Sequence, residues 1–158
     1  MNRIAPSLFL FLSSLFFASC SSDEIVEQRE WTPAPTAEAS EAQVGGVYTT
    51  ASGLQYEVLR KGTGKKPSRT DRVRVHYHGY LPGGEVFDSS VNRGETIVFG
   101  LNSVIPGWTE GVQLMREGAK YRFKIPSRLA YGQKGSPPKI GPNQDLLFEI
   151  ELFEVVAP

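Results

Sequence analysis

The sequence predicts an α+β domain in which an antiparallel β-sheet carries one short α-helix. Apolar and polar residues alternate in four short runs between residues 54 and 152, which is the period-two pattern of strands that bury one face. Clusters of Gly and Pro separate these runs and predict turns. One segment, residues 106–115, instead places its apolar residues at helical spacing. Several strands with a single helix favour the α+β class.

Each of the four alternating runs gathers apolar side chains on one face. In the first run, Leu54, Tyr56 and Val58 share a face. The second run, residues 72–78, separates its valines and Tyr77 from its arginines and histidines. The last two runs, residues 120–125 and 146–152, repeat this pattern with Tyr121, Phe123 and Ile125 in one and Leu146, Phe148, Ile150 and Leu152 in the other. All four runs predict half-buried strands.

The segment that starts at Pro106 predicts the helix. Proline suits the first turn of a helix because its φ is already helical and its missing N–H would be unpaired there anyway. Trp108, Val112 and Met115 follow at helical spacing and predict a buried stripe. Gly118 predicts a stop after this stripe.

The first twenty residues are typical of a bacterial export signal. Arg3 and the amino terminus are positive, and the apolar stretch from residue 4 to residue 17 is shorter than the roughly 20 residues that a membrane span needs. Phe17-Ala18-Ser19 precedes Cys20 and resembles a bacterial lipobox, although an aliphatic residue is usual where Phe17 stands. This pattern predicts lipidation of Cys20, and ordinary signal cleavage nearby is the alternative. The Ser after the cysteine resembles the sorting pattern of outer-membrane lipoproteins, so we expect an exported, periplasm-facing or cell-surface lipoprotein.

Residues 21–47 differ in composition from the rest of the chain. They are rich in Ser, Ala, Glu and Pro and carry a net charge of −5, whereas residues 48–158 carry +4. Few large apolar residues are present, so we expect a flexible acidic tether followed by one domain from Tyr48 to Pro158. The basic residues of that domain are scattered among apolar positions, which argues against a nucleic-acid surface. Because Cys20 is the only cysteine, no internal disulfide is expected.

Five motifs follow one another between residues 73 and 152. They are Val-His-Tyr-His-Gly-Tyr-Leu at 75–81, Val-Phe-Asp-Ser-Ser at 86–90, Val-Ile-Pro-Gly-Trp-Thr-Glu-Gly at 104–111, Leu-Ala-Tyr-Gly at 129–132 and Leu-Leu-Phe-Glu-Ile-Glu-Leu at 146–152. Their order and spacing resemble the catalytic domain of FKBP-type peptidyl-prolyl cis-trans isomerases. The segment Ser-Gly-Leu-Gln-Tyr at 52–56 is similar to bacterial exported members of the macrophage infectivity potentiator type. The resemblance implies a twisted sheet wrapped around the helix, with a pocket between them.

The resemblance also implies the residues of that pocket. The catalytic set would be Tyr77, Phe87, Asp88, Ile105, Trp108, Tyr131 and Phe148. Further substrate contacts would come from Arg93, Ile97, Phe99, Val104 and Ile140. The indole of Trp108 would lie beneath the proline ring, and the Ile105 amide and the Tyr131 hydroxyl would donate hydrogen bonds to substrate carbonyls. Ile97 stands where the family often has an aromatic residue, so we expect one aliphatic wall.

The residues themselves leave other interpretations open. Aromatic residues on alternating strands, and a Trp on a short helix, are often plain core. Asp88 precedes two serines and could satisfy the backbone of a turn. His76 and His78 share the polar face of a strand, but two histidines without further ligands are weak evidence for a metal, so we expect neither a metal nor a cofactor.

We therefore expect an isomerase that rotates X–Pro bonds in unfolded exported proteins by stabilising the twisted amide without covalent chemistry. Its partners would be proline-containing polypeptides, rapamycin-like macrolides as inhibitors and the membrane that holds the lipid anchor. We expect a monomer, because about 26 tether residues are too few for a long helical dimerisation module. The alternatives are a proline-segment-binding chaperone with little catalysis and a surface interaction protein.

Overall fold

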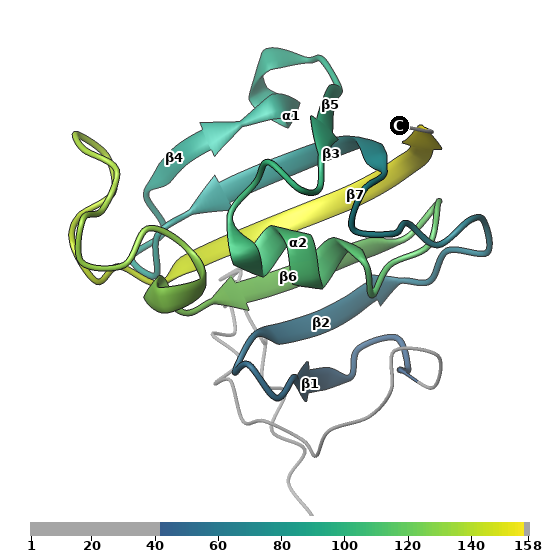
Figure 1. Ribbon diagram of the computed structural model, residues 1–158, viewed down its shortest axis with the longest axis horizontal. Helices are drawn as coiled ribbons and strands as arrows, with labels where there is room; N and C mark the ends of the chain where they lie inside the picture. Colours follow the sequence, from purple (N-terminus) through teal and green to yellow (C-terminus); the bar gives the residue numbers. More distant parts are fainter. Residues whose placement is uncertain (1–41, 157–158) are drawn as a thin grey trace, which may run out of the picture. The chain divides into compact units, whose positions relative to one another are not determined.

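The computed structural model describes residues 42–156, which form a twisted antiparallel sheet with one main helix against it (Figure 1). The described elements follow the chain as β1 (Val47–Thr49), β2 (Gln55–Arg60), β3 (Arg72–Tyr80), β4 (Val86–Ser89), α1 (Ser90–Arg93), β5 (Ile97–Gly100), α2 (Pro106–Val112), β6 (Lys120–Ile125), the 3-10 turn η1 (Ser127–Leu129) and β7 (Leu146–Val156). The predicted α+β class is confirmed.

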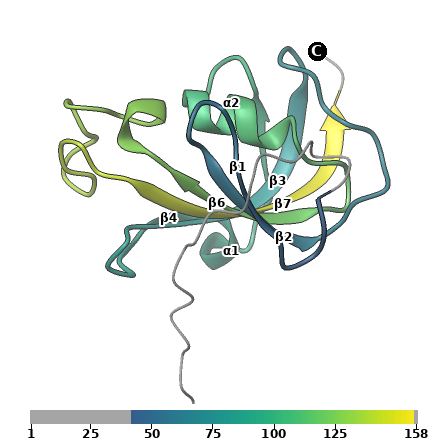
Figure 2. The same cartoon turned by 90° about the horizontal axis from the view of Figure 1, so that it is seen from below.

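The sheet runs in the order β1-β2-β6-β7-β3-β4, and β5 pairs with the other half of β3. All the pairings are antiparallel. The longest strand, β7, lies between β6 and β3, so the chain enters the middle of the sheet last. Figure 2 shows α2 on one side of the sheet and the short α1 on the other.

The predicted alternation is present in the four main strands. Tyr56, Val75, Tyr121 and Ile150 are all at most 5% exposed, and each belongs to the predicted apolar face of its strand. A β-bulge shifts the pattern near the end of β7, because Leu152 pairs with Val75 while Glu154 pairs with Arg74. The extra residue, Phe153, is 44% exposed, and beyond it Val155 is buried. A bulge thus returns an apolar residue to the core after the simple alternation ends.

Helix α2 packs closely against the sheet because it carries two glycines on its buried face. A Cβ at Gly111 would lie 2.8 Å from the Cε1 atom of Phe123, which leaves no room for a side chain there. The helix begins at Pro106 as predicted, but it ends at Val112 and not near Gly118. After Val112 the chain winds more tightly than an α-helix, because the amides of Leu114 and Met115 donate hydrogen bonds to carbonyls only three residues earlier. Met115 is nevertheless fully buried.

The described structure begins slightly before Tyr48, the expected start of the domain. The Gly45 amide donates to the Val58 carbonyl at 2.8 Å, and β1 begins at Val47. The expected signal segment, Cys20 and the tether up to residue 41 lie outside the described residues. Within residues 42–156, no helix is long and apolar enough to cross a membrane.

Candidate active site

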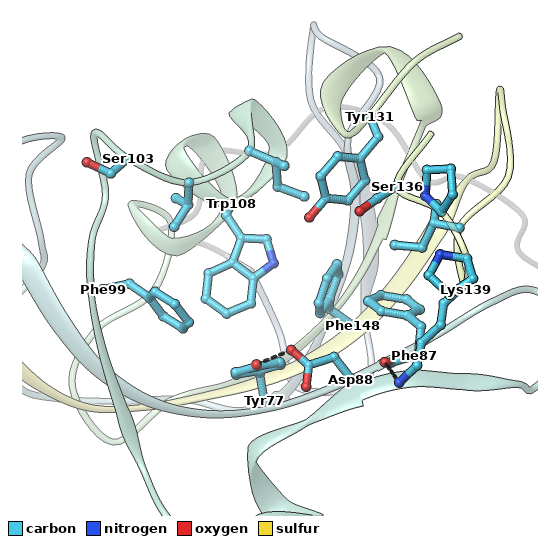
Figure 3. Close-up of a pocket in the computed structure, with 15 residues that line it drawn as sticks. Tyr77, Phe87, Asp88, Phe99, Ser103, Trp108, Tyr131, Ser136, Lys139 and Phe148 are labelled. Atoms are coloured by element: carbon cyan, nitrogen blue, oxygen red, sulfur yellow. Dashed lines mark hydrogen bonds between the residues drawn. The ribbon is translucent and has the colours of Figure 1, made fainter. Parts of the chain in front are cut away.

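A cavity of about 760 Å³ opens between α2, β4 and the loop that joins β6 to β7 (Figure 3). This volume is in the range of ligand pockets, and most of its walls are apolar. Its lining residues are Tyr77, Phe87, Asp88, Phe99, Ser103, Val104, Ile105, Trp108, Tyr131, Ser136, Pro137, Pro138, Lys139, Ile140 and Phe148.

The indole ring of Trp108 is held in place by aromatic rings from three strands. The centroids of the Tyr77, Phe99 and Phe148 rings lie 5.3–5.5 Å from the indole, each at an angle of 81–85° to it. Edge-to-face contacts of this kind add to the stability that burial already provides. Because the rings fix its edges, the face of the indole has a set orientation on the floor of the cavity.

A polar cluster of three residues lies at one side of this floor. The Tyr77 hydroxyl donates a hydrogen bond to the Asp88 carboxylate, which also pairs with the Arg93 guanidinium. Arg93 donates a second hydrogen bond to the Tyr77 hydroxyl oxygen at 2.9 Å. Asp88 therefore bonds with these two side chains as well as with the backbone amide of Ser89.

The same cluster sets the ionisation of its members. Burial by itself would raise the pKa of Asp88, but hydrogen bonds from Tyr77 and Arg93 outweigh this and hold the pKa below its ordinary value. Burial raises the pKa of Tyr77, and the hydrogen bond to Asp88 adds to the effect. At neutral pH the floor therefore carries an ionised carboxylate next to a neutral phenol, and Arg93 balances the carboxylate charge.

Two serines behind the site hold β4 in place. The Ser90 hydroxyl is fully buried and accepts a hydrogen bond from the Tyr77 amide at 2.8 Å. His76 and His78 bring their Nδ1 atoms to the Ser90 and Ser89 hydroxyls at 3.0 and 2.9 Å. Both histidines thus have a structural role on the far face of the sheet. The described residues contain no group of three or more potential metal-ligating side chains.

Two hydrogen-bond donors at the cavity are unused within residues 42–156. The Ile105 amide precedes the first turn of α2, and no described group accepts its hydrogen. The Tyr131 hydroxyl likewise has no partner among the described residues. Tyr131 follows η1 in the loop between β6 and β7, and its hydroxyl projects into the cavity (Figure 3). An apolar cavity in which these two groups can donate hydrogen bonds is suited to bind the carbonyl oxygens of a peptide.

The structure brings together most of the residues predicted from the sequence. All seven members of the predicted catalytic set line the cavity, together with Phe99, Val104 and Ile140. Arg93 does not line it and acts on it through Asp88 and Tyr77. Ile97 does not line the cavity either: it packs beside the core, because two positions along β5 move it about 7 Å from Phe99. The aliphatic residues that do line the cavity are Val104, Ile105 and Ile140.

Five lining residues were not predicted: Ser103, Ser136, Pro137, Pro138 and Lys139. Four of them belong to the loop between β6 and β7, where the sequence showed only turn residues. The Gly-Ser-Pro-Pro cluster at residues 135–138 indicated a turn but not its position over the cavity.

Comparison with known proteins agrees with this geometry. A family model described as FKBP-type peptidyl-prolyl cis-trans isomerase matches residues 63–153. This chain belongs to that family. Among related FKBP-type proteins, it is 54% identical over 120 residues to the isomerase FkpA of Aeromonas hydrophila, an alignment that covers 76% of this chain and 44% of the relative. It is 52% identical to the FKBP-type 22 kDa isomerase of Escherichia coli, over 73% of this chain and 56% of the relative.

Solved structures of the FKBP type are also similar. The crystal structure of FkpA from Escherichia coli matches with a TM-score of 0.69 and 43% sequence identity, covering 76% of this chain and 56% of that one. The chain thus spans about half the length of the curated relatives it matches.

Proposed function

We propose that this protein is a peptidyl-prolyl cis-trans isomerase. The observation that carries the proposal is an aromatic cavity in which two donors that no described group uses, the Ile105 amide and the Tyr131 hydroxyl, accompany the indole of Trp108. This combination fits a proline ring and the carbonyls beside it. The names of the relatives support the same activity.

The proposed chemistry needs no covalent step. Resonance flattens the X–Pro amide and sets a rotation barrier of about 18–20 kcal/mol. At the twisted transition state this resonance is lost, and the C–N bond is less polar than in the planar amide. An apolar cavity that excludes water therefore favours the transition state over the planar ground state, which is catalysis by differential binding.

Each cavity group has a part in this proposal. Trp108 supplies the surface under the proline ring, and the two donors orient the chain by binding its carbonyl oxygens. Asp88 places a negative charge at the edge of the cavity, near the bond that rotates. Arg93 keeps that carboxylate ionised and oriented.

The apolar lining also predicts the preferred substrate. An aliphatic or aromatic residue before proline would gain from contact with the cavity walls, whereas a carboxylate would lose hydration there. Leu-Pro peptides should therefore be turned over faster than Glu-Pro peptides, and equal rates would contradict this preference.

The activity is tested by NMR exchange between the cis and trans forms of a Leu-Pro peptide with the purified protein, with and without rapamycin. We expect catalysed exchange that the macrolide abolishes. Tyr131→Phe is the matched variant, because it removes one hydroxyl and keeps the ring; it should lower the exchange rate several-fold. Peptide binding without catalysed exchange would indicate a proline-binding chaperone module instead.

We also propose that the protein is an exported lipoprotein, anchored through Cys20, that assists the folding of other exported proteins. Mass spectrometry of its amino-terminal peptide tests the anchor. The lipobox-like Phe17-Ala18-Ser19-Cys20 supports this proposal. A lipid on Cys20 that is missing from the Cys20→Ser variant would agree with the proposal. A Cys20 without lipid, or a mature protein from which Cys20 has been cleaved off, would contradict it. The outer-membrane location and the monomeric state stay predictions, which membrane fractionation and light scattering would check.

A further inference from the structure

The loop between β6 and β7 forms one wall of the cavity, but few bonds join its tip to the rest of the domain. Within the tip, residues 133–140, Ser136 and Ile140 exchange two backbone hydrogen bonds, of 2.8 and 3.1 Å. The Gly135 amide donates to Tyr131 in the same loop. These bonds fix the shape of the tip, but they do not fix its position relative to the opposite wall.

Lys139 makes the bond that crosses to the opposite wall. Its Nζ atom donates a hydrogen bond of 2.7 Å to the carbonyl oxygen of Phe87, drawn as a dashed line in Figure 3. Among the hydrogen bonds of residues 42–156, this is the one that joins the tip to another element. A hydrogen bond from a charged donor is stronger than a bond between neutral groups.

The acceptor, the Phe87 carbonyl, belongs to a strand at the edge of the sheet. In the described sheet β4 is an edge strand, paired with β3 on one side only. Its register shifts at Phe87, because Gly79 pairs with Asp88 while Tyr80 pairs with Val86. Phe87 is therefore a bulge residue whose ring lines the cavity and whose carbonyl faces the loop.

The residues beside this bond are those that would contact substrate. Ile140 follows Lys139 and is 5% exposed inside the cavity, and Asp88 follows Phe87 on the other wall. A shift of the tip relative to β4 would therefore change the distance between two walls of the cavity. A wall that must be ordered at the moment of binding reduces affinity by the cost of that ordering.

We propose that Lys139 is a positioning residue that holds residues 133–140 against β4, so that the cavity is preformed for a proline-containing segment. This inference rests on the proposed function, since it names Lys139 as the residue that sets the width of the proposed substrate cavity. Lys139 does not act on the rotating bond, so its loss should weaken binding and leave the chemical step unchanged.

The test compares the whole protein with Lys139→Met, Lys139→Arg and Lys134→Met. Methionine is likewise unbranched, although one atom shorter, and cannot donate a hydrogen bond, whereas arginine retains a charged donor. Lys134 is the matched control, because it is an exposed lysine of the same loop whose side chain makes no hydrogen bond or ion pair with the described residues. Lys139 is exposed as well, so the variants should fold.

We expect Lys139→Met to raise KM and the Kd of a Leu-Pro peptide about fivefold while kcat stays within twofold. Amide hydrogen exchange across residues 131–143 should become faster in Lys139→Met. In Lys139→Arg and in Lys134→Met, KM, Kd and amide exchange should stay close to those of the wild type. An unchanged Kd in Lys139→Met, or an equal change in Lys134→Met, would overturn the proposal.

The Kd keeps this inference separate from the proposed activity. If the wild-type protein binds the peptide without catalysing its exchange, the isomerase proposal fails while the binding comparison still decides the role of Lys139. If the wild-type protein catalyses exchange and Lys139→Met equals it, only the role of Lys139 is refuted. A wild-type protein that does not bind the peptide would overturn both.

Discussion

A methyl group at Gly79 would test how tightly the aromatic walls are packed. Gly79 lies on the inner face of β3, and a Cβ there would lie 2.7 Å from the Cζ atom of Phe87 and 2.8 Å from the Cε1 atom of Phe148. Carbon atoms at their optimal separation are about 3.5–4.0 Å apart. Both rings would therefore have to move by about 1 Å.

Neither ring is free to move without disturbing others. Phe87 and Phe148 pack edge to face with their centroids 5.3 Å apart, and Phe148 meets Trp108 in the same way. Overpacking of this kind costs about 1–3 kcal/mol, from which the lower flexibility of the unfolded Ala chain recovers about 0.5–1 kcal/mol. The mid-range values leave a net loss of about 1 kcal/mol, which corresponds to a Tm lowered by about 4–5 °C in a domain of this size.

Thermal denaturation followed by circular dichroism measures this change, and peptide exchange by NMR measures its effect on the cavity. Gly83→Ala is the matched control, because a Cβ at Gly83 has no atom within 4 Å. We expect Gly79→Ala to lower both Tm and exchange, and Gly83→Ala to change Tm by less than about 1 °C. A Gly79→Ala protein with the Tm and activity of the wild type would show that the walls yield easily, and would refute the tight packing argued above.

Predictions at three further residues follow from the site. Trp108→Ala should lower the free energy of unfolding by about 3–5 kcal/mol and abolish peptide binding, because it removes an indole that is only 5% exposed. Denaturant titration measures the loss of stability, and Trp108→Phe, which keeps an aromatic ring, should lose less. Asp88→Ala should lower the exchange rate while the domain stays folded, and wild-type activity would leave Asp88 with only a structural role. The pKa of Asp88 is lowered on folding, so its stabilising effect is present above its unfolded pKa of about 3.9 and is lost as pH falls through the folded value. The Tm difference between wild type and Asp88→Asn should thus shrink as pH falls below about 4, and a constant difference would contradict the shift. Ser90→Ala should lower stability by about 1–3 kcal/mol at an unchanged m-value, because the buried Tyr77 amide loses its acceptor.

The sequence was most informative where a local pattern repeats. Alternation identified the inner faces of the main strands because side chains on a strand change sides at every residue. Pro106 located the start of α2 for a similarly local reason. The end of that helix was missed, since the chain after Val112 tightens into a turn while Met115 remains in the core.

Local pattern was also weak for short elements. Strands β4 and β5 have four residues each, which is too short for alternation to stand out. For Asp88, the local sequence favoured a turn over a cavity, because its side-chain partners, Tyr77 and Arg93, are 11 and 5 residues away.

The sequence by itself determined the class of the fold, the aromatic character of the site and, through the order of its motifs, the family. Only the tertiary structure decided which of these residues face one cavity. It excluded Ile97, gave Arg93 an indirect role and placed Lys139 across from Phe87, 52 residues earlier in the chain. The physical reason is that periodicity reports which face of an element is buried, whereas a cavity wall depends on where separate elements and loops meet in space.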